Sequence, residues 1–500
     1  MSTHTSDRTE VIKQNRLSEF QLRGATNLAH VKTKAFYDVN DDIKEIPKYR
    51  ACFSKSLKHD AQGTVDKDEF MKLYEGSTQC KCLFEKIEYP GKLRLVNPSS
   101  IYSLDLIGPY KSSVPIAPCP SFCSEQIAAE MIELYNMALC RDVPFDQYNN
   151  DPSVLNAIND LNPVSNLQGT TQTIFRGSNP GATKGPFVSQ FFYSPYSHGV
   201  TDIEQIYRFD KPGVDYMTEW DKALSVQNGT VLESAPPRNL KRYISTLRDG
   251  ATFVHLDDPS QIITMIAGVL KKIGCPSAKG IPYGKSIKEL AFIDLGGLDY
   301  VDLCMRAVRS AMLCAWYHKY GILRLRPEEY GMQVHQVKTG NLSSKHFSSD
   351  LLESDVLNRI HAKYGSYLLP QAYPEGSPVH PAYPAGHAAF AGAITTITKA
   401  FFDEDFQIDA FQPSPDGQTL VPLGYKLRVG YELDKMASNI DTFRDAAGVH
   451  WRSDGAGLEL GEEIAIIILK DHIMRYPHKV KFSFHKRNGE RVKITNETDD

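Results

Sequence analysis

The sequence predicts a mainly α-helical protein, with a helical-bundle catalytic core, long loops and a few short β-hairpins. Two observations favour this class. Apolar side chains recur with helical spacing over five long segments, at about 260–273, 299–320, 387–403, 430–446 and 457–474. Strand-like alternation marks the tail, where residues 480–484 and 492–494 flank Asn488-Gly489 and predict a hairpin.

The N-terminal half is less regular than the C-terminal half. Residues 1–120 mix polar and apolar character, with a helix expected at 69–75 and extended segments and turns at 91–120; we expect this region to serve assembly. Residues 121–260 form a second region, which begins with a helix at 125–135 and continues as short helices and loops that cover the core.

The second half holds the predicted catalytic bundle, residues 261–478. Loops 321–350 and 365–386 are long enough to predict a functional role, and both lead into site motifs. This pattern is typical of side chains that converge from several helices inside a bundle. Residues 479–500 form the hairpin and tail, which we expect to be an edge or an intersubunit element.

Cationic and imidazole side chains gather in three motifs. They are Lys319-x6-Arg326-Pro327, His380-x6-His387 and Arg444-x5-His450-x3-Asp454. Guanidinium forks match the oxygens of a phosphate-like anion, and lysine adds a mobile point charge. The apolar segment after Pro384 places His387 and the Gly386 amide at a helix N-terminus, which also favours an anion. The motifs therefore predict a pocket for a tetrahedral oxyanion.

Each motif also has an ordinary interpretation when it is taken alone. Arg326-Pro327 can mark only the end of a helix, and His380 can be a loop histidine beside a proline. His450, between Val449 and Trp451, can be a half-buried histidine with its hydrogen bonds satisfied. Because all three motifs occur together and in a fixed order, an oxyanion site is favoured over these separate ordinary interpretations.

The three motifs resemble those of the vanadium-dependent haloperoxidases, in the superfamily that includes the type 2 phosphatidic acid phosphatases. The superfamily pattern has serines where this sequence has Ala385 and Phe443. The longer motifs, together with segments 177–181 and 185–191, are most similar to the bromoperoxidase branch of red algae and cyanobacteria. The resemblance spans roughly residues 90–475.

The resemblance implies an activity and a role for each site residue. His450 would bind vanadium as its one protein ligand, and His387 would be the acid–base group. The groups expected to hold the vanadate oxygens are Lys319, Arg326, Arg444 and the Gly386 amide. The implied reaction is the oxidation of halide by hydrogen peroxide to hypohalous acid, which halogenates small organic substrates. Relatives are large symmetric oligomers, so a homo-oligomer is expected.

Five positions refine this interpretation. Lys319 would also polarise the bound peroxide, and His380, usually a histidine in bromoperoxidases, implies a preference for bromide and iodide. Asp454 either orients His450 from one helical turn away or is a solvated helix residue. Ala385 removes a hydroxyl group from the buried anion, a deficit of ~1 to 3 kcal/mol unless water replaces it. Phe443 matters less, since the matching serine is not universal among haloperoxidases.

Two rival functions use the same residues. In a soluble acid phosphatase, His450 would be the nucleophile and His387 would protonate the leaving oxygen. In a catalytically silent oligomeric shell protein, the pocket would have decayed at Ala385. The retained cations and histidines argue against the second rival, and His380 against the first.

Composition excludes several classes of partner. The 56 basic and 60 acidic residues give a net charge of −4 without a long basic run, so nucleic acid is not expected. No segment reaches ~18 continuous apolar residues and residues 1–16 lack the apolar core of a secretory signal, so we expect no membrane partner and a cytoplasmic location.

Candidate metal sites other than the vanadate pocket are weak. The nine cysteines include Cys80-x-Cys82 and Cys119-x3-Cys123, but no histidine lies near either pair, so zinc is not expected. We expect most cysteines to be reduced, while a disulfide between subunits is left open. The calcium-like stretch after Lys58 has a cation at the first ligand position, which favours a turn entering a helix. Asp299 is expected to be the N-cap of a helix at 300 or, with Phe292, a structural calcium ligand.

Overall fold

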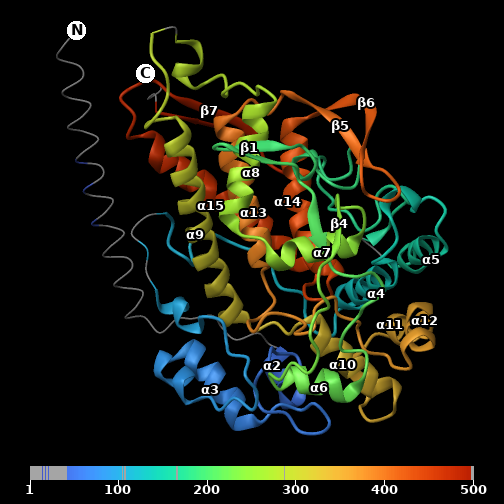
Figure 1. Ribbon diagram of the computed structural model, residues 1–500. Helices are drawn as coiled ribbons and strands as arrows, with labels where there is room; N and C mark the ends of the chain where they lie inside the picture. Colours follow the sequence, from blue (N-terminus) through green and yellow to red (C-terminus); the bar gives the residue numbers. More distant parts are fainter. Residues whose placement is uncertain are drawn as a thin grey trace.

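The computed structural model describes residues 42–496, except 104, 106–107, 165–166 and 287. It also describes the single positions 14, 17 and 21. The first part of the predicted region 1–120 and the last four residues therefore lie outside the described chain. Within it, long helices and four small sheets confirm the predicted fold class (Figure 1).

The centre of the fold is helix α13 (Gly386–Phe401), which contacts three other long helices. Every residue of α13 except His387 is buried. Its neighbours are α9 (Gly297–Ile322), α14 (Val429–Ala446) and α15 (Ala456–Ile473), as Figure 1 shows. All four helices were predicted from periodicity, because the apolar and small residues that face a neighbouring helix recur with helical spacing.

Small residues let α13 and α15 approach closely. A methyl group on Gly392 would overlap the backbone of Leu458, and one on Gly461 would overlap the carbonyl oxygen of Ala389. The two helices thus pack backbone against backbone. This contact fixes the N-terminal end of α13, where two of the predicted site residues lie.

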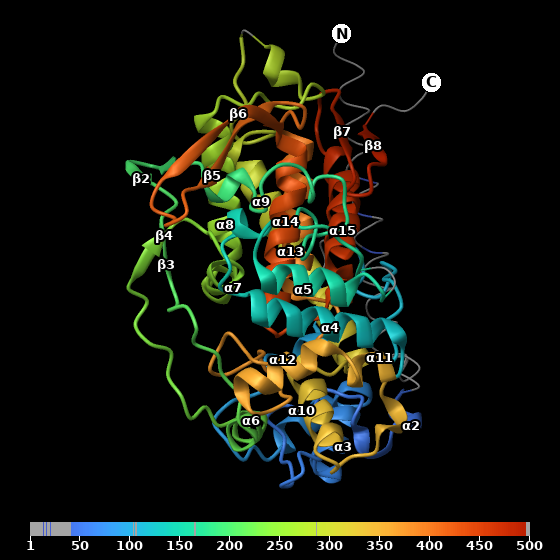
Figure 2. The same cartoon turned by 90° about the vertical axis from the view of Figure 1, so that its right-hand side faces the viewer.

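A second layer covers the bundle. Helix α7 (Leu247–Leu256) packs on α14 and starts with a capping box between Thr246 and Asp249. Helix α8 (Pro259–Lys272) follows and matches its predicted span. Helices α4 (Glu125–Cys140) and α5 (Pro152–Leu161) lie side by side across the lower half of the molecule (Figure 2).

The predicted loop 321–350 is wrong. It contains α10 (Pro327–Lys338) and the start of α11 (Ser349–Leu352). Helix α10 has proline at its first position, where the backbone amide would have no partner within the helix and proline has no amide hydrogen. Its first turn also contains two glutamates, whose carboxylates interact favourably with the positive end of the helix dipole. Arg326-Pro327 therefore marks a helix start. The other predicted loop forms no helix between α12 (Asp355–Tyr364) and α13.

The remaining elements are short. The helices are α2 (Asp42–Glu45), α3 (Lys67–Thr78) and α6 (Trp220–Gln227). The strands pair antiparallel as β1 (Tyr196–His198) with β2 (Thr201–Ile203), β3 (Tyr207–Phe209) with β4 (Leu240–Arg242), β5 (Gln407–Pro413) with β6 (Leu420–Arg428), and β7 (Lys481–His485) with β8 (Arg491–Thr495). The last hairpin was predicted, whereas β5 and β6 were not, because proline and charged residues interrupt their alternation.

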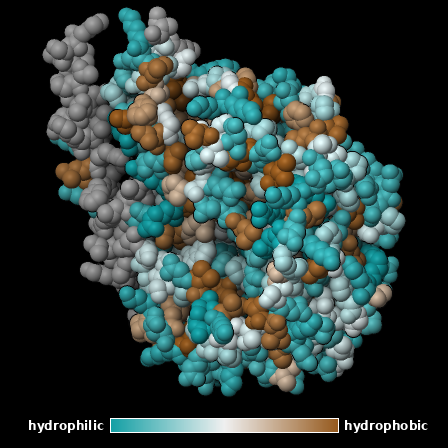
Figure 3. All heavy atoms as spheres, viewed as in Figure 1, coloured by the Kyte–Doolittle hydropathy of each residue, from teal (hydrophilic) through white to brown (hydrophobic). Residues whose placement is uncertain are grey.

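No helix in the described part of the chain has both the length and the apolar run that crossing a bilayer requires. The face in Figure 3 is largely hydrophilic, with separate apolar patches. Cys80 and Cys82 form a disulfide within the chain, and the other seven cysteines are free.

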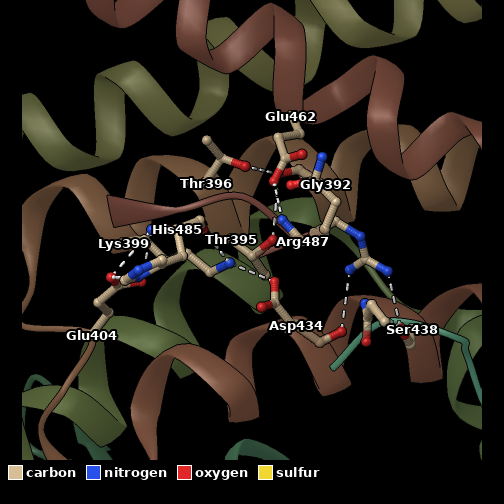
Figure 4. A network of polar contacts seen from close by, with 12 residues as sticks. Gly392, Thr395, Thr396, Lys399, Glu404, Asp434, Ser438, Glu462, His485 and Arg487 are labelled. Carbon is tan, nitrogen blue, oxygen red and sulfur yellow. Dashed lines mark hydrogen bonds and ion pairs between the residues drawn. The ribbon is translucent and has the colours of Figure 1, made fainter. Parts of the chain in front are cut away.

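The C-terminal hairpin packs on the protein's own bundle (Figure 4). The Lys399 ammonium group donates to Asp434 at 2.5 Å and to the His485 carbonyl at 3.0 Å. The Arg487 guanidinium donates to Ser438 at 3.0 Å, while its backbone amide donates to Glu462 at 2.9 Å. These buried contacts tie the tail to α13, α14 and α15.

At both candidate calcium sites, the aspartate side chains accept hydrogen bonds from the protein itself. Asp66 caps α3, and the turn before it is closed by Asp60, as the prediction of a turn entering a helix requires. The predicted N-cap role of Asp299 is wrong, because α9 starts earlier, at Gly297. Asp299 lies in the first turn, where it accepts hydrogen bonds from the Leu295 amide, His472 and Tyr476.

Candidate active site

Residues of two motifs line one cavity of about 460 Å³, and Arg326 of the third motif contacts two lining residues, His380 and His450, from behind the cavity wall. Lys319 lies in the last turn of α9, Arg326 directly precedes α10, and Arg444 lies in the last turn of α14. His387 opens α13, and His450 lies between α14 and a short 3-10 turn. The lining includes Gly386, His380, His387, Arg444 and His450, together with the apolar side chains of Met312, Trp316 and Phe390.

His450 presents one ring nitrogen to the pocket. Its Nδ1 donates to Oδ2 of Asp454 at 2.7 Å, which leaves Nε2 as the nitrogen with a free electron pair. Arg326 donates to this Nε2 at 2.9 Å. Burial, and then the charges of Arg326 and Lys319, hold the pKa of His450 well below its usual value. The ring is therefore neutral and suited to bind a metal through Nε2.

Three buried cations surround this nitrogen. The Lys319 ammonium donates to the carbonyls of Pro381 at 2.9 Å and Ala382 at 2.7 Å, and Arg326 donates to backbone carbonyls and histidine nitrogens. Burial and the neighbouring arginines hold the pKa of Lys319 well below its usual value, while burial lowers that of Arg326 to about 10.

These three cations lack carboxylate partners. In the described chain, the nearby Asp454 carboxylate pairs with Arg324, and no carboxylate pairs with Lys319, Arg326 or Arg444. Among the described residues, Arg444 donates to the Val254 carbonyl alone, and its buried Nε has no hydrogen-bond partner there. Buried charges require a counter-charge, so this surplus fits a bound oxyanion.

His387 is paired with an aspartate from another element. Its Nε2 lies 3.0 Å from Oδ1 of Asp257, which is located between α7 and α8. Burial lowers the pKa of His387, and the opposing effect of Asp257 does not fully offset it. The ring is oriented by a carboxylate and is about one-quarter exposed, so it can exchange protons with the cavity.

His380 is bonded to Arg326 twice. Its Nδ1 accepts from Nη2 of Arg326 at 3.0 Å, and its carbonyl accepts from Nε at 2.9 Å. Its ring centroid lies 4.8 Å from that of Trp316. Burial and the charges of Lys319 and Arg326 hold the pKa of His380 well below its usual value. The histidine is thus a neutral acceptor that aims the guanidinium.

The alanine that replaces the family serine lies at the N-cap of α13. Ala385 is fully buried, and α13 has no side-chain cap there. A Cβ atom on Gly386 would lie 3.2 Å from Cε of Met312 and 3.4 Å from the Trp316 ring, so glycine keeps this helix end open. Phe443 packs on Gly250 of α7 and serves the contact between α7 and α14.

Comparison with known proteins identifies the family. The domain described as VCPO second helical-bundle domain matches residues 300–477. A vanadium-dependent bromoperoxidase of Ascophyllum nodosum is 32% identical over 483 residues, covering 89% of this chain and 86% of that protein. The chain belongs to the vanadium-dependent haloperoxidase family. A bromoperoxidase of Corallina officinalis is 31% identical, covering 80% of this chain and 79% of that protein.

A solved structure agrees with this family. The homohexameric second vanadate-dependent bromoperoxidase of Ascophyllum nodosum superposes with a TM-score of 0.88 at 27% identity. The match covers 96% of this chain and 90% of that one. The similarity therefore includes the N-terminal half as well as the bundle.

Several residues that line or support the haloperoxidase cavity were missed in the sequence. Arg324 donates to Asp454 at 2.7 Å and is fully buried, but a single arginine two residues before Arg326 carries no pattern. Asp257 belongs to none of the three motifs, and its neighbour Asp258 is the N-cap of α8. The other missed residues come from three separate segments and are His255, Met312, Trp316, Tyr373 and Glu375.

Proposed function

We propose that this protein oxidises bromide and iodide with hydrogen peroxide, in a vanadate-dependent reaction, to hypohalous acid that halogenates small organic substrates. One observation carries the proposal. Three buried cations that have no carboxylate partner among the described residues surround Nε2 of a neutral histidine, in a chain that belongs to the vanadium-dependent haloperoxidase family. All three curated relatives are named vanadium-dependent bromoperoxidases.

The donor set fits vanadate. His450 would bind the metal through Nε2, and the oxygens would be held by Lys319, Arg326, Arg444 and the Gly386 amide. The helix N-terminus adds a positive dipole end at Gly386. When bound, vanadate supplies a Lewis acid that activates peroxide without a change in its own oxidation state.

The remaining roles belong to the side chains around the anion. We assign acid–base work to His387, because Asp257 orients its ring and the ring reaches the cavity. Lys319 would withdraw electron density from a bound peroxide oxygen, and a low pKa makes its proton easier to share. His380 would keep Arg326 aimed at the oxyanion.

The rival functions have less support. A phosphatase could use the same pocket, but the three curated relatives are all named bromoperoxidases. A silent shell protein would not need three uncompensated buried cations, which are costly without a ligand.

We also infer that the protein forms a homo-oligomer. The similar Ascophyllum structure is a homohexamer. Large apolar side chains are exposed on the outer start of α9 and the loop before it, and such a patch is typical of an interface. They are Leu290, Phe292, Ile293, Leu298, Val301 and Met305. Cytoplasmic location stays a prediction from the sequence, and calcium at Asp299 stays the alternative that the sequence left open.

A bromination assay tests the proposed function. A phenol-type dye, peroxide and bromide are combined with the metal-free or the vanadate-loaded protein. We expect turnover only with vanadate, and we expect His450→Ala to abolish it. The control His361→Ala, whose exposed ring stacks on Tyr367, should retain the wild-type turnover. Hydrolysis of a phosphate monoester at a useful rate without any vanadate-dependent bromination would favour the phosphatase instead.

A further inference from the structure

A third histidine–carboxylate pair lies on the wall of the active-site cavity. Nε2 of His255, at the end of α7, is 2.5 Å from Oε1 of Glu375 in the loop before α13. Both residues line the cavity that also holds His387 and His450. Their side chains are 20% and 31% exposed, so water reaches this pair more easily than it reaches His450, which is 1% exposed.

Several elements hold the pair in place. The His255 ring stacks on Tyr373, with centroids 3.9 Å apart and planes 11° from parallel. The Tyr373 hydroxyl donates to the Ala251 carbonyl at 2.6 Å, and the Glu375 carbonyl accepts from the Lys55 ammonium at 2.6 Å. The pair is therefore a fixed part of the wall.

The charges around the pair come from four elements. Burial raises the pKa of Glu375, but the hydrogen bond and charge of His255 outweigh it, so that this pKa lies below its usual value. Lys55 also lowers it. Asp257 lies two residues from His255, and the Arg444 guanidinium lies 5.4 Å from the Tyr373 ring. The Nδ1 atom of His255 has no partner among the described residues, so only one ring nitrogen is committed to Glu375.

The proposed reaction consumes a proton in every turnover. Hydrogen peroxide, one halide ion and one proton give hypohalous acid and water: the halide loses two electrons, the O–O bond breaks, and the proton completes the water. The buried cations oppose the entry of protons, and they lower the pKa of His387 together with burial. A histidine paired with a carboxylate would overcome this electrostatic barrier, because the negative charge stabilises the protonated ring on its way into the cavity.

We propose that His255 and Glu375 form a proton-delivering pair, which takes protons from bulk water and passes them through the cavity to His387. This inference rests on the proposed function and extends it. Glu375 stabilises the protonated ring, and the stacked Tyr373 keeps the ring at the wall.

Rate profiles against pH test the pair. In vanadate-loaded His255→Gln, we expect the turnover number for bromide to fall at least about tenfold at pH 8 and little at pH 5, where protons are abundant. Added imidazole should restore the rate at pH 8, and the KM for bromide should stay unchanged. His361→Gln is the matched control, because that ring also stacks on a tyrosine but lies outside the cavity lining.

Two readouts do not depend on turnover. Equilibrium dialysis should give the same vanadate affinity for wild type and His255→Gln, and equal melting temperatures exclude misfolding. In the metal-free protein, the NMR signals of the His255 ring should shift in Glu375→Gln, because Nε2 loses its carboxylate partner. Unchanged ring signals would overturn the proposal.

The outcomes separate the inference from the function on which it rests. A wild-type protein without vanadate-dependent bromination contradicts the proposed function itself. An active wild type, together with a His255→Gln loss that is equal at every pH and is not rescued by imidazole, contradicts the proton-delivering pair alone. An unchanged rate in His255→Gln also contradicts it.

Discussion

His450 donates its Nδ1 proton to Oδ2 of Asp454 across 2.7 Å, and this contact determines which ring nitrogen faces the anion pocket. Asp454 is itself fully buried, and the cost of burying it is offset by Arg324, which donates to its Oδ1 at 2.7 Å. The expected contact is thus present, although a 3-10 turn, not a helical turn, brings the carboxylate to the ring. A charged carboxylate in this place also makes the histidine a stronger electron donor.

Asp454→Asn should therefore weaken vanadate binding by about 10- to 100-fold, because the amide neither fixes the ring tautomer nor raises its basicity. Isothermal titration of the metal-free protein with vanadate measures the change. Asp355→Asn, at the exposed start of α12, provides the control. An affinity within twofold of wild type would exclude this role for Asp454.

Ala385→Ser should strengthen vanadate binding by up to about tenfold. The new hydroxyl would lie at the open N-cap of α13, beside the Gly386 amide, where it can donate to an oxygen of the anion. The same titration measures the gain. A higher melting temperature without a gain in affinity would instead mean that the hydroxyl caps the helix, which contributes about 1 kcal/mol.

The sequence was sufficient for the bundle because its helices keep their apolar period. The segments predicted for α9, α13, α14 and α15 match the structure within a few residues at each end. Helix α10 was missed because Arg-Pro is compatible with either end of a helix, and only the two following glutamates favour a start.

The site was predictable only where its residues form compact motifs. Lys319, Arg326 and His450 come from segments with fixed internal spacing, and the structure brings them together. Asp257, His255 and Glu375 are single residues, and only the packing of α7 against α14 and the loop before α13 brings them to the same cavity. Such tertiary proximity leaves no local pattern in a single sequence.

His380→Phe should lower the preference for bromide over chloride. The phenyl ring cannot accept from Arg326, so Nη2 of that arginine loses its 3.0 Å partner and is free to bind another anion oxygen or a halide. The ratio of kcat/KM values for the two halides measures the change. If His380→Phe retains the wild-type ratio, the selectivity arises elsewhere in the lining.

Calcium removal should leave the melting temperature unchanged. Both carboxylate oxygens of Asp299 already accept hydrogen bonds, from His472 at 2.8 Å, from the Leu295 amide at 2.8 Å and from Tyr476. Asp299→Asn should nevertheless destabilise the protein by about 1 to 3 kcal/mol, because these buried donors lose a charged acceptor. Calorimetry with and without a calcium chelator separates the two effects. A chelator-dependent fall in melting temperature would instead indicate a calcium site.

Asp215 should make stability depend on pH in the acidic range. It is almost fully buried between Arg141 and Arg248, and it also accepts from the Tyr364 hydroxyl at 2.6 Å. Burial alone would raise its pKa, but the two arginines outweigh burial and lower the pKa to about 2. Because the folded pKa lies below the unfolded value of about 3.9, the stabilisation is complete above about pH 4 and is lost as the pH falls toward 2.

Asp215→Asn should therefore lower the free energy of unfolding by about 3 kcal/mol near pH 7, because it leaves two buried guanidinium groups short of a charged partner. The difference from wild type should shrink as the pH falls from 4 toward 2, where the wild-type carboxylate also becomes neutral. Denaturant titrations at several pH values measure it. Asp409→Asn, in the exposed pair with Lys426, should change stability by less than about 1 kcal/mol. A constant difference between wild type and Asp215→Asn at every pH would show that the charge of Asp215 is not the stabilising feature.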